Sequence, residues 1–588
     1  MNIFDVLSMI GGLALFLFGM ETMGNGLTKT SGSKLESILA SLTSSVPKGV
    51  LLGCVVTAVI QSSSATTVML VGFVNSGIMK LRQAIPVIMG ANIGTTATAW
   101  ILSLASIDGD SIFMKLLKPM SFSPVLAAVA MVFIMFSKSE RKHNIGLTMI
   151  GFAVLMYGMD IMSQAVSPLR DVPEFVNVLT MFQNPILGVA AGAVFTAAIQ
   201  SSSASVGILQ ALCMTGSVTY SSAIPIIMGQ NIGTCVTALL SSIGANKGAK
   251  RVAAVHLSFN IIGTVVLLAA FYGINGVVEF KFIDEVADPA DIALIHSIFN
   301  IVATAMLLPF YRQLEKLAMV IVKDVPEKKT KDETLLLLDE RFLETPSFAT
   351  AKCLEVSHKM ALHSKNCISE ALKLLTDYTK DRAEHVNLLE DKIDRYEDAL
   401  GAYIVKLERQ DLSAADNNTL SMILHNIGDL ERISDHGKNI GEVADELHRK
   451  GLKFSKEAMA EINVFIDAVK EIVDTAIDSF VNMDVDNAEN VEPLEEVIDN
   501  INDEVKNRHI DRLRRGECTI ELGFILSDLG TNLERVADHC SNIAACTIET
   551  QRDEFDMHKY VYGVKKFGVG DFDAKEKLFR EKYSLPIH

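Results

Sequence analysis

The chain has 588 residues, 49% of them hydrophobic, and a formal net charge of −17 at pH 7. Residues 1–323 hold 18 of the 53 Lys and Arg side chains and 15 of the 70 Asp and Glu side chains, which leaves 35 and 55 for the rest of the chain. The first part is therefore apolar and nearly neutral, and the second is acidic without a long apolar run. These properties exclude a wholly soluble protein. They predict a membrane domain over 1–323 followed by a soluble domain, and no nucleic-acid partner is expected.

Seven apolar runs are long enough to cross a bilayer as helices. Two more apolar stretches, 49–75 and 188–214, are each interrupted by a Gln-Ser-Ser-Ser string. Irregular backbone at membrane depth is tolerated only where it is buried or lines a cavity, so each stretch predicts a re-entrant helical hairpin. The predicted fold class is all-α, a polytopic membrane protein with two such hairpins. The seven predicted spans are 5–28, 83–105, 120–137, 144–167, 222–244, 252–275 and 292–310.

The two interrupted stretches belong to a duplication. The string Gln61–Ala65 returns as Gln200–Ala204, and Pro86–Thr95 returns as Pro225–Thr234, both at an offset of 139 residues. Each copy contains three spans, an odd number, so the second is expected to be inverted in the membrane relative to the first. The hairpin tips would then meet near the midplane, at a site reachable from either face. Repeat one is predicted at about 12–150, repeat two at about 151–289, and an extra span at 292–310.

The charges of the loops predict the orientation of the membrane domain. Basic residues gather in the loops on one side, whereas the loop before the last span is acidic. By the positive-inside rule the basic side faces the cytoplasm. The soluble domain follows the last span on that side, so it is expected in the cytoplasm and the protein in the cell membrane. Representative residues are Lys80, Arg82, Lys247, Lys250 and Arg251 on the basic side and Asp284, Glu285, Asp288 and Asp291 on the acidic side.

The broken helices offer donors for an anion. A helix N-terminus exposes unpaired backbone N–H groups and carries about half a positive charge, which attracts an anion. Serine hydroxyls and glutamine amides add donors suited to a tetrahedral oxyanion, without a fixed positive charge that would hinder release. The candidate anion ligands are Gln61, Ser62, Ser63, Ser64, Gln200, Ser201, Ser202 and Ser203.

Oxygen atoms of the same region suit sodium, a hard cation that would offset the charge of a multivalent anion in a low dielectric. Glu21 and Asp160, which the repeat pairs, could equally form a proton site or lie near helix ends and reach water. Small residues that only let helices approach closely are the alternative explanation of the serine clusters, although such motifs do not require glutamine. The candidate sodium ligands are Ser64, Thr66, Thr95, Thr98, Ser203, Ser205, Thr234, Thr237, Glu21 and Asp160.

The duplicated Gln-Ser-Ser-Ser-Ala and Pro-x-Ile-Met-Gly-x-Asn-Ile-Gly-Thr strings resemble those of the sodium-phosphate cotransporter family, the type II class of animals and its bacterial relatives. The resemblance covers about residues 12–310. In that family the two hairpins line the transport path and take part in binding phosphate and sodium. The resemblance therefore implies phosphate as the anion at the serines and glutamines, with Asn92 and Asn231 as neighbouring ligands. The animal members end without a large soluble domain, unlike this chain.

The second part of the chain resembles the PhoU family. Asp429–Ile440 and Asn532–Ile543 each carry that family's Glu-Arg-x-x-Asp motif, and Glu390–Asp394 and Glu495–Asp499 resemble its partner helix. Two copies imply two three-helix bundles side by side over 347–550. The charged segment 324–346 is predicted to be a linker, and the segment 551–588 a flexible tail.

The acidic residues of these motifs are spaced four apart, so like charges lie on one helix face. A metal ion would relieve the repulsion, and oxygen-only ligands favour Mg, Mn or Fe. The resemblance supports this hypothesis, because PhoU relatives can carry multinuclear metal clusters on such faces. The alternative is a solvated or arginine-paired face, with Arg432 and Arg535 alongside. The candidate metal ligands are Glu390, Asp394, Glu431, Asp435, Glu495, Asp499, Glu534 and Asp538.

The sequence favours a sodium-coupled secondary transporter of inorganic phosphate that works by alternating access and carries a regulatory cytoplasmic domain. A membrane-bound phosphate sensor without net flux and a phosphate exporter are the alternatives. An enzyme is not expected, because the serines lack a neighbouring His or Asp base and the chain has no phosphate-cradling glycine loop. The sequence leaves both a monomer and a homodimer open.

Overall fold

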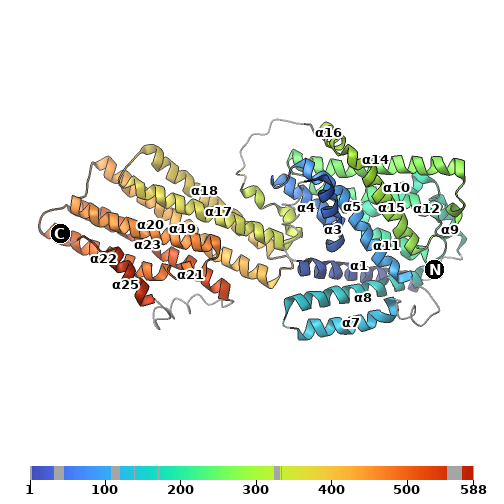
Figure 1. Ribbon diagram of the computed structural model, residues 1–588, viewed down its shortest axis with the longest axis horizontal. Coiled ribbons are helices and arrows are strands. Elements are labelled where there is room, and N and C mark those ends of the chain that lie inside the picture. The colour runs from blue at the N-terminus through green and yellow to red at the C-terminus, as the bar shows by residue number, and fades with distance from the viewer. Residues whose placement is uncertain are drawn as a thin grey trace. The chain divides into compact units, whose positions relative to one another are not determined.

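The computed structural model describes residues 3–31, 45–106, 119–137, 139–168, 172–323, 332, 334–552 and 572–586. These residues form helices and turns, apart from an isolated bridge between Thr219 and Val286. The chain divides into two compact units, Met1–Phe348 and Ala349–His588, which run from blue to green and from yellow to red in Figure 1. The predicted all-α class is confirmed.

The first unit contains corresponding helices from the two repeats. Repeat one supplies α1 (Ile3–Ser31), α3 (Val46–Ile60), α4 (Ser63–Asn75), α5 (Leu81–Ser103) and α7 (Pro119–Phe136). Repeat two supplies α8 (Glu140–Val166), α9 (Pro173–Met181), α10 (Pro185–Ile199), α11 (Ser202–Cys213), α12 (Tyr220–Gly233), α13 (Cys235–Ser241) and α14 (Lys247–Val278). The remaining elements are α15 (Pro289–Leu307), α16 (Tyr311–Ile321) and the 3-10 helices η1 (Leu104–Ser106), η3 (Lys281–Asp284), η4 (Leu308–Phe310), η5 (Leu335–Leu337) and η6 (Glu340–Glu344).

All seven predicted spans are helical. Among the described residues, 6 helical segments are long and apolar enough to cross a membrane: 3–30, 81–103, 141–166, 220–241, 247–278 and 289–321. The seventh span, α7, belongs to the shorter apolar helices. The two interrupted stretches fold as the pairs α3–α4 and α10–α11, as expected of helical hairpins.

Glycines let equivalent helices approach closely in both repeats. A Cβ atom on Gly53 of α3 would lie 2.1 Å from the carbonyl oxygen of Val87, and one on Gly192 of α10 would lie 2.1 Å from that of Ile226. Only residues without a side chain allow backbones this near. The first limb of each hairpin is therefore seated against the span that follows it, α5 or α12.

The helices α14 and α15 continue the internal symmetry. Thr264 on α14 donates a hydrogen bond to the carbonyl oxygen of Met228, and Thr304 on α15 donates one to that of Met89, both at 3.3 Å. Met89 and Met228 are equivalent positions of the duplication. Each long helix is thus attached to the span of one repeat in the same way.

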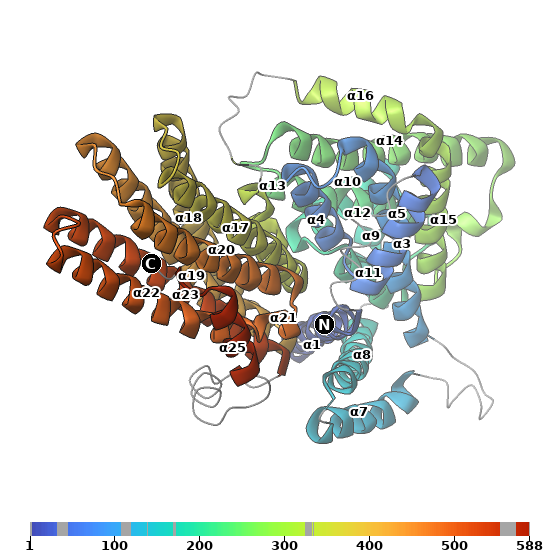
Figure 2. The same cartoon turned by 60° about the vertical axis from the view of Figure 1, so that its left-hand side comes forward.

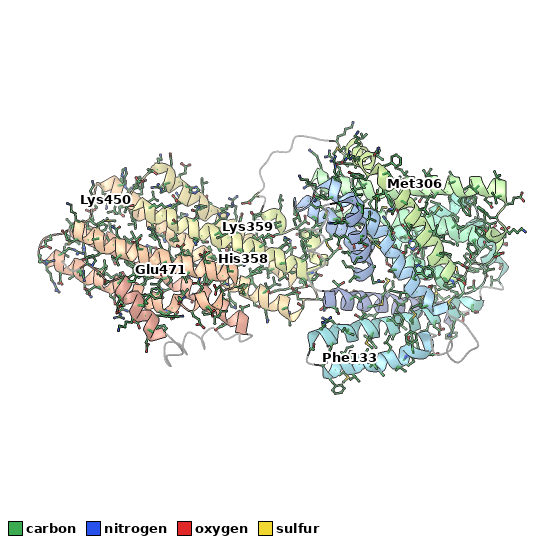
Figure 3. The ribbon with its side chains drawn as sticks, in the orientation of Figure 1. Phe133, Met306, His358, Lys359, Lys450 and Glu471 are labelled. Atoms are coloured by element: carbon green, nitrogen blue, oxygen red, sulfur yellow. The ribbon has the colours of Figure 1, made fainter. Side chains whose placement is uncertain are left out.

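The second unit consists of two three-helix bundles, as the repeated motifs predict (Figures 1 and 2). Its surface carries charged side chains such as Lys359, Lys450 and Glu471, labelled in Figure 3. The helices are amphipathic, and residues such as Leu430 and Val536 lie fully buried between them. The first bundle comprises α17 (Pro346–Leu374), α18 (Lys380–Leu407) and α19 (Ala414–Lys450); the second comprises α20 (Lys456–Asn482), α22 (Val491–Arg514) and α23 (Ile520–Arg552), with the short α21 (Val485–Ala488).

Parts of both predicted connecting segments, the linker and the tail, are folded. Within the predicted linker 324–346, residues 324–331 and 333 lie outside the described residues, but η5 and η6 are folded, and Phe342 is fully buried within the first unit. Within the predicted tail 551–588, residues 553–571 and 587–588 lie outside the described residues, but α25 (Phe572–Lys582) packs on α22. The hydroxyl of Tyr583 donates to Glu471 of α20. Apolar side chains, which the charged surroundings mask in the sequence, explain both departures.

Candidate functional site

Each hairpin turns at its glutamine. Gln61 has φ 59° and ψ 19°, and Gln200 has φ 60° and ψ 18°. This left-handed conformation costs a residue with a side chain about 1–3 kcal/mol, so it persists only where the surroundings impose it. The backbone N–H groups of Gln61 and Gln200 each donate to a threonine carbonyl at 2.8 Å, that of Thr57 or Thr196. The same left-handed turn in both copies indicates that the surrounding structure imposes the break in each helix.

The first serine of each string caps the second limb of its hairpin. The Ser62 hydroxyl accepts a hydrogen bond from the N–H of Ala65 at 3.1 Å, and the Ser201 hydroxyl accepts one from Ala204 at 3.2 Å. An N-cap serine satisfies one of the unpaired N–H groups at a helix start. The helices α4 and α11 therefore begin at Ser63 and Ser202, with their N-termini at the hairpin tips.

The two tips meet. The hydroxyl oxygens of Ser63 and Ser202 lie 3.3 Å apart, and both residues are buried. Behind the tips, Thr57 donates to Thr66 at 3.1 Å. In the second copy Thr196 donates to Ser205 at 2.7 Å. These bonds join the two limbs of each hairpin and hold the tip serines in place.

The surroundings of the two glutamines differ. Gln61 is buried, and its side-chain oxygen accepts a hydrogen bond from Thr98 at 2.9 Å. Gln200 is exposed, and Thr237, the counterpart of Thr98, donates instead to the carbonyl of Thr234 at 3.0 Å. The two copies of the hairpin therefore do not share one environment.

The candidate phosphate and sodium ligands outside the hairpins lie on the spans that follow the hairpins or on α1 and α8. Asn92, Thr95, Asn231 and Thr234 each donate to the carbonyl one turn earlier at 2.9–3.1 Å, which leaves their oxygen atoms as the groups able to bind a cation. Glu21 is exposed on α1. Asp160 is half-buried on α8 and accepts from Gln164 at 2.6 Å. Among the described residues, neither carboxylate is hydrogen-bonded to a hairpin.

Two glutamines missed by the sequence analysis join the second hairpin to its neighbours. Gln210 of α11 donates to the carbonyls of Ala99 at 3.0 Å and Pro289 at 2.8 Å, and Gln230 of α12 donates to the carbonyl of Ser205 at 3.1 Å. Their counterparts in repeat one are Val71 and Ala91. Polar residues that replace apolar ones at the repeat offset were the signal that could have revealed them.

In the second unit, six of the eight candidate metal ligands converge as two groups of three. Within each group the potential ligand atoms lie within 4.8 Å of one another. Of the other two, Glu534 accepts from Asn502, and Glu431 lies 3.6 Å from Arg432, which is also 3.8 Å from Asp435. Burial and the neighbouring Asp435 carboxylate raise the pKa of Glu431 to about 7. The two groups are Glu390, Asp394 and Asp435, and Glu495, Asp499 and Asp538.

Cations lie beside both acidic groups, and the guanidinium of Arg535 is 2.9 Å from Asp538 in the second. The ammonium of Lys438 lies 2.7 Å from Glu390 in the first group. The equivalent position in the second copy is Ser541, whose hydroxyl donates to Glu492. Burial raises the pKa of Glu390 and of Asp394. A bound metal would have to compete with the ammonium in the first group but not at that position of the second.

The helices α19 and α23 meet through a crossed pair of histidines. The Nδ1 atom of His436 lies 2.8 Å from the side-chain oxygen of Asn532, and that of His539 lies 2.7 Å from Asp429. The two imidazole rings stack with their centroids 5.7 Å apart. Burial lowers the pKa of His436. The copies are thus joined by equivalent contacts, of which only the one at Asp429 contains a carboxylate.

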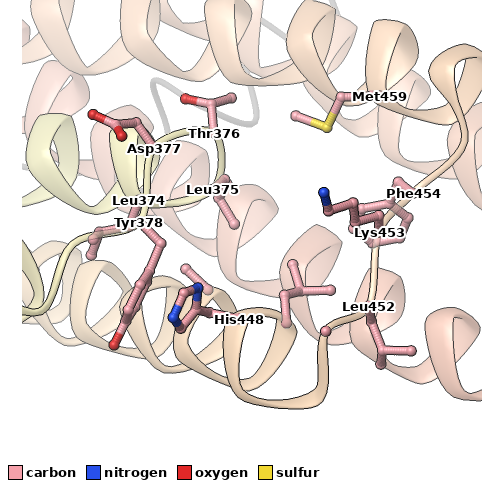
Figure 4. Close-up of a pocket in the computed structure, with 13 residues that line it drawn as sticks. Leu374, Leu375, Thr376, Asp377, Tyr378, His448, Leu452, Lys453, Phe454 and Met459 are labelled. Carbon is pink, nitrogen blue, oxygen red and sulfur yellow. The ribbon is translucent and has the colours of Figure 1, made fainter.

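A cavity of about 610 Å³ lies at one end of the first bundle, between the turn after α17 and the turn after α19 (Figure 4). The Tyr378 and His448 rings stack there at 4.3 Å, and the Tyr378 hydroxyl donates to Asp445 at 2.5 Å. Lys453 and Phe454 line the opposite side. None of the candidate metal ligands lines this cavity, which is therefore separate from the acidic groups.

The comparisons with known proteins match both units. The family model described as Na+/Pi-cotransporter matches residues 15–164 and 172–282, and that of the PhoU domain matches 358–444 and 462–547. The chain is 24% identical over 560 residues to YjbB of Salmonella typhimurium, provisionally named an inorganic phosphate export protein, over 94% of this chain and 99% of that one. It is 35% identical over 98 residues to the sodium-dependent phosphate transport protein 2A of Rattus norvegicus, over 16% of this chain and 15% of that one. The crystal structure of PhoU from Pseudomonas aeruginosa is 23% identical with a TM-score of 0.33, over 35% of this chain and 98% of that chain.

Proposed function

Because residues 15–164 and 172–282 match the model of the Na+/Pi-cotransporter family and the rest of the chain carries a PhoU domain, we propose that the protein is a sodium-coupled secondary transporter of inorganic phosphate. The observation that carries the proposal is the contact between Ser63 and Ser202 at the tips of the two inverted hairpins. It supports a single substrate site between the repeats, as alternating access requires. The membrane, the phosphate and the sodium ion are the partners that this function implies.

The tip residues fit phosphate without a fixed cation. Gln61–Ser64 and Gln200–Ser203 contain only neutral donors, and two helix N-termini converge on the place where Ser63 meets Ser202. Neutral donors and helix dipoles attract an oxyanion but let it leave again. Asn92 and Asn231 are proposed to complete the phosphate site from the following spans.

The oxygen atoms of the site fit sodium. Side-chain oxygens of Thr66, Thr95, Thr98 and their copies lie on the hairpins and the next spans, and sodium bound among them would offset the phosphate charge in the low dielectric. Glu21 and Asp160 are proposed to be outer ligands of the cation. The relatives' names include both an export protein and a sodium-dependent transport protein. The two ion gradients set the direction, since one alternating site serves uptake and export alike.

The second unit is proposed to be a cytoplasmic regulator that binds a divalent metal. The group of Glu495, Asp499 and Asp538 offers three carboxylates within 4.8 Å, a ligand set that suits Mg, Mn or Fe. The metal would neutralise the clustered negative charge and fix the two helices that carry it. At the group of Glu390, Asp394 and Asp435 the metal would have to displace the ammonium of Lys438 from Glu390.

Uptake of radiolabelled phosphate into proteoliposomes under an imposed sodium gradient tests the proposed transport. We expect accumulation above the equilibrium level with inward sodium and none with potassium in its place. Phosphate binding to the purified protein without any sodium-driven accumulation would instead identify a membrane-bound phosphate sensor.

A further inference from the structure

The segment Leu337–Phe348, called the strap below, is held on the first hairpin. It lies between the residues matched by the two families, which end at 282 and begin again at 358. All of it belongs to the first compact unit. It packs on α4, the hairpin limb that begins at Ser63, at the end opposite the tip.

Three phenylalanines form the apolar part of this contact. Phe342 and Phe348 of the strap and Phe73 of α4 have ring centroids 4.9–5.6 Å apart, and all three are buried. A Cβ atom on Gly72 would lie 2.6 Å from the Phe342 ring. Only glycine at position 72 leaves room for the Phe342 ring against α4, and this contact is called the seat of Phe342 below.

Hydrogen bonds join the strap to α4 and to the end of α13, and the same asparagine of α4 is bonded to the cap of α14. Asn75 of α4 donates to Asp339 at 2.6 Å. Arg341 donates to Asp339 at 2.6 Å and to the carbonyl of Ser241, at the end of α13, at 2.8 Å. The side-chain oxygen of Asn75 also accepts from the backbone N–H of Asn246, which caps α14, at 2.8 Å. The strap thus fastens the first hairpin to elements of the second repeat.

In the part of the chain that the structure describes, no segment packs on the second hairpin as the strap packs on the first. At the repeat offset, Gly72, Phe73 and Asn75 correspond to Ala211, Leu212 and Met214. The tips, the strained glutamines and the glycine contacts are all duplicated, but these three residues are not. The three residues of α4 that hold the strap are therefore specific to the first hairpin, which indicates that this hairpin is adapted to it.

We propose that the strap is a brake on the first hairpin, through which the second unit regulates transport. Alternating access requires the repeats to move against one another, whereas the strap ties α4 to the end of α13. Phe348 lies in the first turn of α17, and this helix continues into the second unit. A change of state in the second unit can therefore act on the seat of Phe342, provided that it favours one strap position over the other. This inference rests on the proposed transport function, and Phe342, Asp339 and Arg341 are positioning residues in it.

A reversible bridge tests the brake in the full chain. Gly72→Cys and Phe342→Cys are combined after the eight native cysteines have been replaced. Bridging the pair with copper phenanthroline or a short bis-methanethiosulfonate should lower phosphate flux by about fivefold or more, the lower end of the usual coupling between sites. Dithiothreitol should restore it in the same vesicles. Ala211→Cys with Phe342→Cys is the matched control and should not bridge. A pair that fails to bridge, or that bridges with unchanged flux, overturns the proposal.

A second set of variants distinguishes a change in the contact between Gly72 and Phe342 from general damage to the fold. Gly72→Ala places a methyl group where the Phe342 ring lies, so it should displace the strap and raise flux at low sodium. Adding Phe342→Ala makes room for the methyl group, so the double variant should behave as Phe342→Ala alone. Additive effects of the two substitutions would contradict a shared seat.

A readout without transport keeps this inference separable from the proposed function. A single cysteine introduced by Ala65→Cys at the first tip reports the mobility of the hairpin through its rate of thiol modification. Bridging the strap should slow that rate. If the parent chain shows no sodium-driven flux but the rate still falls on bridging, the transport function is wrong and the brake on the hairpin stands. An unchanged rate removes the brake.

Discussion

Ser63 and Ser202 lie 139 residues apart in the chain, yet their hydroxyl oxygens are 3.3 Å from each other. They are equivalent positions of the duplication, and each is the first residue of a broken helix, α4 or α11. The contact therefore lies where the two copies meet. An anion at this contact could interact with both helix N-termini. This arrangement favours one shared site over two separate sites.

Removing either hydroxyl should weaken phosphate transport. A hydrogen bond to a charged group is worth about 1.5–3 kcal/mol. Ser63→Ala and Ser202→Ala should therefore each raise the phosphate concentration for half-maximal flux by about ten- to a hundredfold. Ser123→Ala, which removes a buried hydroxyl from α7, is the matched control. Normal kinetics in both tip variants would refute the assignment of the hairpins.

The double variant of Ser63 and Ser202 should cost less than the sum of the single ones. Residues in contact around one ligand show coupling energies of about 0.5–3 kcal/mol. The measurement is a double-mutant cycle on phosphate affinity. Strict additivity would mean that the two hydroxyls serve separate sites.

If the repeats are inverted, equivalent loops of the two halves should lie on opposite faces of the membrane. Single cysteines introduced by Lys80→Cys and Lys250→Cys should react with an impermeant thiol reagent only when the cytoplasmic side is opened, and Lys281→Cys should react from outside. All three positions are exposed. Modification of positions 80 and 281 from the same face would disprove the inverted topology.

The ammonium of Lys438 should weaken metal binding at the first acidic group of the second unit. Lys438→Ser reproduces the residue of the second copy and should tighten binding at Glu390, Asp394 and Asp435. Burial raises the pKa of Glu390 and of Asp394, so both are protonated at a higher pH than usual. Metal binding must displace those protons, and its affinity should therefore rise with pH. Titration calorimetry with Mn²⁺ in two buffers measures both effects, and equal affinity in the variant and the parent would contradict the assigned role of Lys438.

The histidine contact between α19 and α23 should make the second unit less stable in acid. Burial lowers the pKa of His436 below the ordinary value of 6.5, so the unfolded chain takes up the proton first. The stabilisation is complete above that ordinary value and declines as pH falls below it towards the lowered pKa. His436→Gln should reduce this decline in thermal unfolding, whereas His425→Gln, at an exposed position of the same helix, should not. Identical pH profiles for parent and H436Q would exclude the contact as a source of acid sensitivity.

The repeat explains why much of the membrane unit could be predicted from the sequence. Matching strings at one offset located both hairpins, and the contact of Ser63 with Ser202 agrees with the expectation that the tips meet. The glycines of the hairpins also recur at that offset, as Gly53 and Gly192 do. Periodic apolar residues and duplicated motifs likewise indicated the two three-helix bundles.

Features that break the repeat could not be predicted in the same way. Gln210 and the strap seat at Gly72 occur in one copy only, so the offset comparison does not pair them. Phe342 lies among charged residues, where the local composition suggests a linker, and its burial depends on partners more than 250 residues earlier in the chain. Gln200 is exposed although it repeats the buried Gln61, a difference that the identical Gln-Ser-Ser-Ser strings do not indicate.

The most direct test of the account is sodium uptake driven by phosphate in proteoliposomes that contain the full chain. An inward phosphate gradient, with equal sodium on both sides at the start, should carry radioactive sodium inward until its concentration inside exceeds that outside. The combined Ser63→Ala and Ser202→Ala variant should abolish this uptake while the protein stays folded in the membrane. Phosphate entry without any accompanying sodium, or sodium uptake that persists in the double variant, would contradict a coupled site at the two hairpin tips.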